Sequence, residues 1–263
     1  MLTAVTITGI IAYLLAALLL SQRISAPNVM RKRTRYLSIL ALASHLLVLV
    51  NVFTETAFVK INLFTTLAII TWIISALNTV RGEQPASILL RPAIYGFAAT
   101  SLLLIMLVPS EVGRPFFMSA IFATHISLAL VASSVLTLAT LYGLQLLYVN
   151  RLLKTHSAKI VSERIPSLMA VEQYFFRLLT AGFIILTLAI VVGFIYLDDL
   201  FASGQLHKTV FTLLAWLSFG SIVVIHYWRG LRGKIAVYYT LLASLLLVLG
   251  YFGSRFVRDI LIG

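Results

Sequence analysis

Eight runs of about 20 mostly apolar residues recur along the chain, each long enough to cross the hydrocarbon layer of a membrane as a helix. They lie near residues 3–21, 37–57, 61–79, 92–109, 117–149, 178–197, 209–227 and 236–254. The short segments between them hold nearly all of the charge. The pattern predicts an all-α, polytopic membrane helix bundle of about eight transmembrane helices, with residues 1–263 forming a single integral membrane domain.

Composition excludes a soluble domain and disfavours a membrane β-barrel. Hydrophobic residues make up 61% of the chain and charged residues only 11%, which is far from the balance of a water-soluble protein. Barrel strands alternate polar and apolar residues, whereas the run 181–197 is apolar on all sides. The absence of cysteine excludes disulfides, thiolate metal sites and the motif that attaches c-type haem covalently.

The distribution of basic residues predicts the orientation of the bundle. If the N-terminus lies outside, 15 of the 20 Lys and Arg residues fall in cytoplasmic segments and five fall in outer segments. The positive-inside rule then places both termini on the outer side of the membrane. The net charge of +12 is therefore mostly a signal of topology and does not indicate binding to nucleic acid.

Three histidines lie within the predicted spans: His45, His125 and His226. Ionisable residues are costly in lipid and are therefore functional candidates, and no carboxylate occupies the centre of a span. The expected depths of His45 and His226 differ by roughly 10 Å, which helix tilt and side-chain reach can close. Neutral imidazoles from facing helices hold haem iron in many bundles, so this pair predicts a haem site. His125 enters the fifth span from the outer side.

The structural alternative for each histidine is an interhelical hydrogen bond. The sequence offers no nucleophile, no acid–base pair and no phosphate-binding loop, so it does not indicate enzymatic turnover.

Several segments resemble one known family. Residues 225–234 read Ile-His-Tyr-Trp-Arg-Gly-Leu-Arg-Gly-Lys and resemble the end of the penultimate helix in the cytochrome c assembly family, of the CcsA, CcmC and HemX types. The stretch from His125 to Gln145 resembles that family's histidine-led helix, and Tyr251-Phe252-Gly253 resembles its final helix. With His45 the resemblance covers nearly the whole chain. Its length and order look closest to the YpjD and HemX branch of eight-helix inner-membrane proteins.

The resemblance implies a multi-pass protein of the bacterial inner (cytoplasmic) membrane, with its outer side periplasmic, that binds non-covalent b-type haem. It implies that His45 and His226 hold the haem iron within the membrane and that His125 is an outer-side axial ligand. The implied partners are the lipid bilayer, haem, and proteins of a haem or cytochrome-assembly pathway. The family's tryptophan-rich outer loop corresponds to residues 198–208, which contain no Trp. Haem binding is therefore implied more directly than haem delivery at the outer face.

The leading hypothesis is haem handling or cytochrome c assembly, including regulation of haem synthesis or export. The second is a transporter or channel that moves a small solute or proton with the intramembrane histidines, although inverted repeats and buried carboxylates are missing. The third is a b-type electron-transfer subunit, and the fourth is a scaffold whose histidines serve packing alone.

Overall fold

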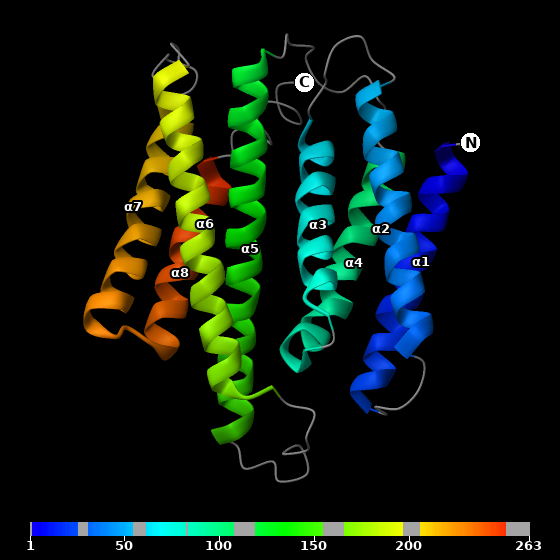
Figure 1. Cartoon of the computed structure of the whole chain (residues 1–263), viewed down its shortest axis with the longest axis horizontal. Helices are drawn as coiled ribbons and strands as arrows, with labels where there is room; N and C mark the ends of the chain where they lie inside the picture. Colours follow the sequence, from blue (N-terminus) through cyan, green and yellow to red (C-terminus); the bar gives the residue numbers. More distant parts are fainter. Residues whose placement is uncertain are drawn as a thin grey trace. The chain divides into compact units, whose positions relative to one another are not determined.

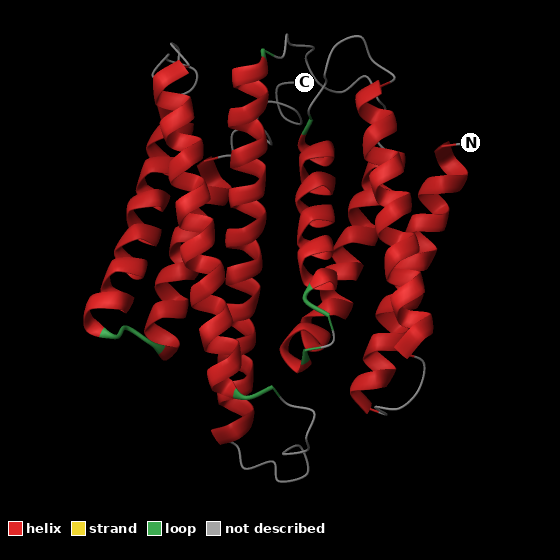
Figure 2. Ribbon diagram, in the orientation of Figure 1, coloured by secondary structure: helices red, strands yellow, loops and turns green. Residues whose placement is uncertain are grey.

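The computed structural model describes residues 2–25, 31–54, 62–82, 84–107, 119–154, 166–196 and 206–250. Helices make up nearly all of these ranges, and no strand occurs in them (Figure 2). The chain divides into two compact units, Met1–Phe117 and Met118–Gly263, each of which contains four helices within the described ranges (Figure 1). The all-helical fold predicted from the apolar runs is confirmed. The predicted outward-facing termini fall on Met1 and residues 251–263, outside the described ranges.

The first unit contains α1 (Leu2–Ser25), α2 (Arg31–Thr54), α3 (Leu63–Val80) and α4 (Pro85–Leu107). Helix α1 packs against α2 and α4, and α3 packs against α4 and α2. Small residues allow these helices to approach closely, because a Cβ atom on Gly9 of α1 would lie 3.2 Å from Cβ of Ser44 on α2. The interior also holds two fully buried tyrosines, Tyr13 and Tyr95.

The second unit contains α5 (Ala120–Lys154), α6 (Leu168–Tyr196), α7 (Leu206–Arg229) and α8 (Gly233–Val248). Helix α6 packs along α5 and also contacts α7, while α8 packs against α5 and α7. Polar side chains join the helices inside the membrane-length region: the Thr140 and Ser244 hydroxyls are 2.6 Å apart, and Trp216 Nε1 donates to Thr187 Oγ1 at 2.8 Å. Such bonds stabilise helix pairs in lipid, where water does not compete for them.

Seven helices of the described chain are long and apolar enough to span a membrane, and α8 is a shorter apolar helix of 16 residues. Three helices, α2, α4 and α6, begin six or more residues earlier than the hydropathy pattern predicts; α4 starts at Pro85 instead of residue 92. Helix α2 starts at Arg31 instead of residue 37, because Lys and Arg are good helix formers and extend their charges to water. Helix α6 starts at Leu168 instead of residue 178, shortly after Pro166, a residue that disfavours helix before it.

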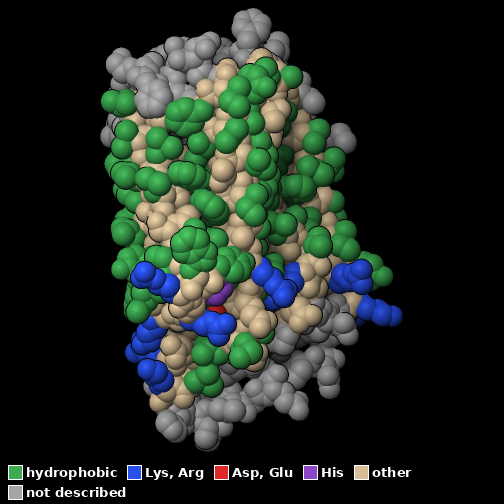
Figure 3. All heavy atoms as spheres, turned by 60° about the vertical axis from the view of Figure 1, so that its left-hand side comes forward, with side chains coloured by type: hydrophobic (Ala, Val, Ile, Leu, Met, Phe, Trp, Pro, Cys, Tyr) green, Lys and Arg blue, Asp and Glu red, His purple; other side chains and the backbone are tan. Residues whose placement is uncertain are grey.

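Apolar side chains cover the outside of the helices, as expected for a surface in contact with lipid tails. Leu18, Phe97 and Ile195, for example, are 58%, 62% and 64% exposed. On the face drawn in Figure 3, apolar side chains occupy most of the height, and Lys and Arg side chains gather in a band below them. In the second unit the last turns of α5 and α7 contribute Arg151, Lys154 and Arg229, a charge asymmetry typical of a cytoplasmic end.

A buried arginine binds backbone carbonyls at the C-terminal end of α3. Arg91 of α4 is only 5% exposed, and its guanidinium donates to the carbonyl oxygens of Asn78, at 3.0 Å, and Gly82. It also donates to Ser87 Oγ at 2.9 Å. Gly82 has φ +74°, the left-handed conformation that ends many helices. The cation therefore adds charged hydrogen bonds to carbonyls that the Ser87 hydroxyl also reaches, at a helix C-terminus where the dipole favours positive charge.

The closest approach between α5 and α6 yields a first prediction. A Cβ atom on Gly182 would lie 2.7 Å from Leu136 Cδ2 and 3.3 Å from the Leu136 backbone nitrogen. We expect Gly182→Val to lower the free energy of unfolding by about 1–2 kcal/mol, because it overpacks this interface. Thermal unfolding followed by tryptophan fluorescence measures the change. Gly96→Val is the matched control, since nothing lies within 4 Å of a Cβ there; equal losses in both variants would contradict the interpretation.

Candidate functional site in the membrane histidines

His45 lies on α2 in the interior of the first unit and is 0% exposed. Its Nδ1 is 3.2 Å from the hydroxyl oxygen of Tyr13 on α1. Its other ring nitrogen, Nε2, is buried and has no hydrogen-bond partner among the described residues. Buried polar atoms are nearly always paired, so an unpaired imidazole nitrogen indicates a place for a ligand or metal. Because Nδ1–H can donate to the phenol oxygen, Nε2 can retain the lone pair that binds a metal.

Aromatic rings hold the His45 imidazole in position. The Tyr13 ring packs edge-on against it, with ring centroids 5.8 Å apart, and Tyr13 in turn contacts Tyr95 of α4 at 5.3 Å. The Tyr95 hydroxyl bonds to Thr79 Oγ1 of α3 at 2.8 Å. Three helices therefore contribute to the surroundings of one imidazole, and its ring orientation is fixed by both packing and a hydrogen bond.

His226 lies in the last turn of α7, and a shaped turn fixes its tautomer. The chain leaves the helix at Gly230, with φ +67°, and the Gly230 amide bonds to the His226 carbonyl at 3.0 Å. The chain then folds back so that the Leu231 carbonyl oxygen lies 2.7 Å from His226 Nδ1. A carbonyl oxygen only accepts hydrogen bonds, so Nδ1 carries the proton, and Nε2 of the neutral ring keeps its lone pair.

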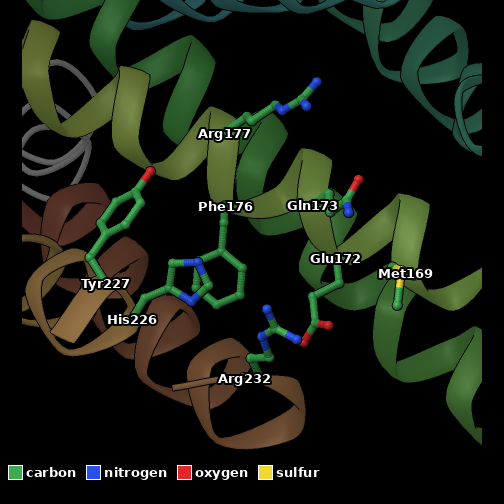
Figure 4. Close-up of a pocket in the computed structure, with 8 residues that line it drawn as sticks. All are labelled: Met169, Glu172, Gln173, Phe176, Arg177, His226, Tyr227 and Arg232. Carbon is green, nitrogen blue, oxygen red and sulfur yellow. The ribbon is translucent and has the colours of Figure 1, made fainter. Parts of the chain in front are cut away.

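A cavity of about 330 Å³ opens beside His226 (Figure 4). The Phe176 ring of α6 stacks on the imidazole, with centroids 3.5 Å apart and planes at 9°. This stack covers one face of the ring. A metal would bind Nε2 at the edge of the ring, in the plane of the imidazole, so the stack does not block that position. Glu172 Oε1 accepts from the Gly233 amide at 2.8 Å and so anchors the start of α8 to α6. The cavity is lined by Met169, Glu172, Gln173, Phe176, Arg177, His226, Tyr227 and Arg232.

His125 lies near the start of α5 and is half-buried against α6. Its Nδ1 is 2.9 Å from the Ala189 carbonyl oxygen, which again assigns the proton to Nδ1. A Cβ on Gly193 would lie 2.8 Å from Cε1 of the ring, so the imidazole fits against α6 only because position 193 has no side chain. The same tautomer as in His226 results from an independent contact.

The contacts with α6 separate His125 from His226. His226 stacks on Phe176, whereas His125 bonds to Ala189, 13 residues further along the helix. At 1.5 Å per residue these contact points are about 20 Å apart, so the two histidines cannot bind one iron together. His45 belongs to the first unit, and its pairing with His226 stays a prediction.

Sequence reasoning did not identify the groups that orient these histidines. Tyr13 gave no signal, because a tyrosine in an apolar span is also typical of ordinary packing. Phe176 and Glu172 lie between the predicted spans 117–149 and 178–197 and were therefore not considered as membrane residues. Gly230 was noted only as part of a family resemblance, although a glycine directly after a helix is a recognised C-cap signal.

Comparison with known proteins gives a consistent result. The family model described as "Cytochrome C assembly protein" matches residues 35–262. Inner membrane protein YpjD of Escherichia coli K12 is 29% identical over 194 residues, which are 74% of this chain and 73% of YpjD. An uncharacterized 28.8 kDa protein of Azospirillum brasilense is 29% identical over 143 residues, covering 53% of this chain and 52% of that protein. No solved structure shows a significant match.

The family match begins within α2 and extends through every later helix of the described chain. YpjD is an inner membrane protein, and seven helices of the described chain have the length and apolar character of membrane spans. The predicted location in the bacterial inner membrane is therefore confirmed, as is the family resemblance. The chain belongs to the cytochrome c assembly protein family.

Proposed function

We propose that this protein binds b-type haem non-covalently within the membrane and handles it for cytochrome c assembly, with Nε2 of His45 and of His226 as axial ligands. The observation that carries the proposal is the fully buried imidazole of His45, whose Nε2 has no hydrogen-bond partner among the described residues. Family membership supplies the second support, because cytochrome c assembly is chemistry of haem proteins.

The donor set fits haem iron. In His226 and His125 a backbone carbonyl accepts from Nδ1, and in His45 a phenol oxygen can do so. Metal-binding histidines usually make such a second bond, which fixes the tautomer and raises the basicity of the other nitrogen. No group of three or more His, Cys, Asp and Glu side chains suited to a bare metal ion occurs among the described residues. Isolated imidazoles fit a cofactor that supplies four of the iron ligands itself.

Aromatic side chains near the two proposed ligands also suit an apolar cofactor. Aromatic rings line both positions: Tyr13 and Tyr95 around His45, and Phe176 beside His226. Arg177 and Arg232 line the cavity at His226, where they can pair with propionate groups. When bound, the haem supplies an iron whose ligand field and potential are set by these two nitrogen ligands.

His125 is assigned a separate role as an axial ligand toward the other end of the second unit. Its contact with α6 lies about 20 Å from that of His226. Under this proposal it binds a second haem or receives haem at the outer side, in keeping with its place near the start of α5.

An absorption spectrum of the purified full chain tests the proposal. We expect protein from haem-replete cells to show a Soret band and, on reduction, the sharp α band of low-spin haem with two nitrogen axial ligands. The pyridine haemochrome assay then quantifies non-covalent haem, which acid acetone should extract completely because the chain has no cysteine to attach it. A colourless preparation that also fails to take up added haemin would refute haem binding.

A further inference from the structure

A second cavity of the second unit lies away from His226. It has a volume of about 440 Å³ and is lined by Leu147, Arg151 and Lys154 of α5 and by Lys234 and Tyr238 of α8. Three of the five lining residues are cations, and none of these described lining residues is acidic. The cavity at His226 differs, because Glu172 there balances part of the charge of its two arginines.

The start of α8 already has one anionic partner, because Glu172 Oε1 accepts from the Gly233 amide at 2.8 Å, and Lys234 adds a cation beside it. Arg151 and Lys154 occupy the last turn of α5, where the helix dipole favours cations. Lys234 instead occupies the first turn of α8, where the dipole disfavours them, and that turn contains no acidic residue. The N-cap residue Arg232 provides no side-chain hydrogen bond to the helix start. An anion in the cavity would interact favourably with the three cations that line it.

An exposed apolar stripe extends from this cavity along α8. Tyr238, Leu242 and Leu245 follow Lys234 at steps of four, four and three residues, so they share one face of the helix. Their exposed fractions are 59%, 53% and 54%. A ligand with a phosphate head and an acyl tail matches this order of charged cavity followed by apolar surface, whereas a free phosphate would use the cavity alone.

We propose that the cavity between α5 and α8 binds the phosphate headgroup of an anionic membrane lipid, with the acyl chain along Tyr238, Leu242 and Leu245. Arg151, Lys154 and Lys234 provide the charge, and the Tyr238 hydroxyl can donate a hydrogen bond to a phosphate oxygen. This inference is independent of haem binding.

Native mass spectrometry of the delipidated full chain tests this inference with phosphatidylglycerol and phosphatidylcholine as probes. We expect the chain to retain phosphatidylglycerol about tenfold better than phosphatidylcholine. The triple variant Arg151→Gln, Lys154→Gln, Lys234→Gln should lose this preference. The charge-matched control is Lys32→Gln, Arg33→Gln, Arg35→Gln on α2, which should keep it. Equal losses in both triple variants would show that general positive charge, not this cavity, selects the lipid.

A single substitution separates lipid binding from folding. Lys234→Glu changes an exposed side chain, so thermal stability should change little. It should nevertheless reduce retention of phosphatidylglycerol, because it places a negative charge against the phosphate. Wild-type retention in this variant would overturn the inference. Displacement of the lipid by a large molar excess of inorganic phosphate would overturn the lipid assignment in favour of a free-anion site.

Discussion

The His45→Ala variant is expected to lose most of the membrane haem, with the Soret band falling by about tenfold at equal protein concentration. Loss of a metal ligand should cost at least as much affinity as loss of a residue that hydrogen-bonds to a ligand. Nε2 of this buried ring has no hydrogen-bond partner among the described residues. Removing the ring would therefore remove a direct bond from Nε2 to iron. Tyr13→Phe keeps the ring but removes the hydroxyl 3.2 Å from Nδ1. It should weaken haem affinity less and shift the reduction potential.

Rescue distinguishes a lost ligand from a lost fold. His45→Ala leaves an imidazole-sized cavity, so added imidazole should restore the low-spin spectrum. His45→Leu fills that cavity with an apolar group and should resist the same rescue. His125→Ala is the comparison variant, because its contact with α6 is about 20 Å from that of His226; it should keep the membrane haem. Full haem content in both His45 variants would remove this residue from the site.

The Arg91→Leu variant is expected to lose about 2–3 kcal/mol of unfolding free energy, one of the largest effects of any single substitution outside the histidines. The guanidinium donates to the carbonyl oxygens of Asn78 and Gly82, and hydrogen bonds to charged groups are stronger than neutral ones. Leucine leaves both oxygens with weaker partners, since the Ser87 hydroxyl reaches them at 3.3 and 3.1 Å. Titration with a denaturing detergent measures the loss.

A lysine at position 91 should recover only part of this stability. All three bonds of Arg91 come from one nitrogen, Nη2, and a lysine ammonium can donate as many. The ammonium is, however, a compact and more strongly hydrated charge, which costs more to bury. Arg35→Leu is the matched control, because Arg35 lies in the same unit but is exposed on α2. If Arg35→Leu destabilised the protein as much as Arg91→Leu, the effect would come from loss of positive charge in general and not from the hydrogen bonds of Arg91 at the C-terminal end of α3.

The number and order of the helices could be predicted because lipid imposes a length and an apolar composition on each span. Helix α1 was predicted at residues 3–21 and runs over Leu2–Ser25, and α3 was predicted at 61–79 and runs over Leu63–Val80. The start of α6 was missed by ten residues. Hydropathy falls at Glu172 and Arg177, yet the helix includes both residues. Glu172 lies near the start of α8, where its carboxylate accepts a hydrogen bond from the Gly233 amide.

The candidate histidines were identifiable because an ionisable group inside a span is rare and costly. Their partners were not. The contact between Tyr13 and His45 joins residues 32 positions apart, and that between His125 and Ala189 joins residues 64 apart. No local pattern in the sequence encodes such pairings, since they depend on how helices rotate and pack. The Phe176–His226 stack has the same origin.

The family match begins at residue 35, so α1 precedes it, yet α1 carries the hydroxyl that bonds to His45. The matched residues thus include the candidate ligand His45 but not Tyr13, whose hydroxyl lies beside it. Under the proposed haem binding, a substitution of Tyr13 would change the electron-donating strength of the imidazole while His45 itself stays in place. Helix α1 would in that case tune the iron without binding it.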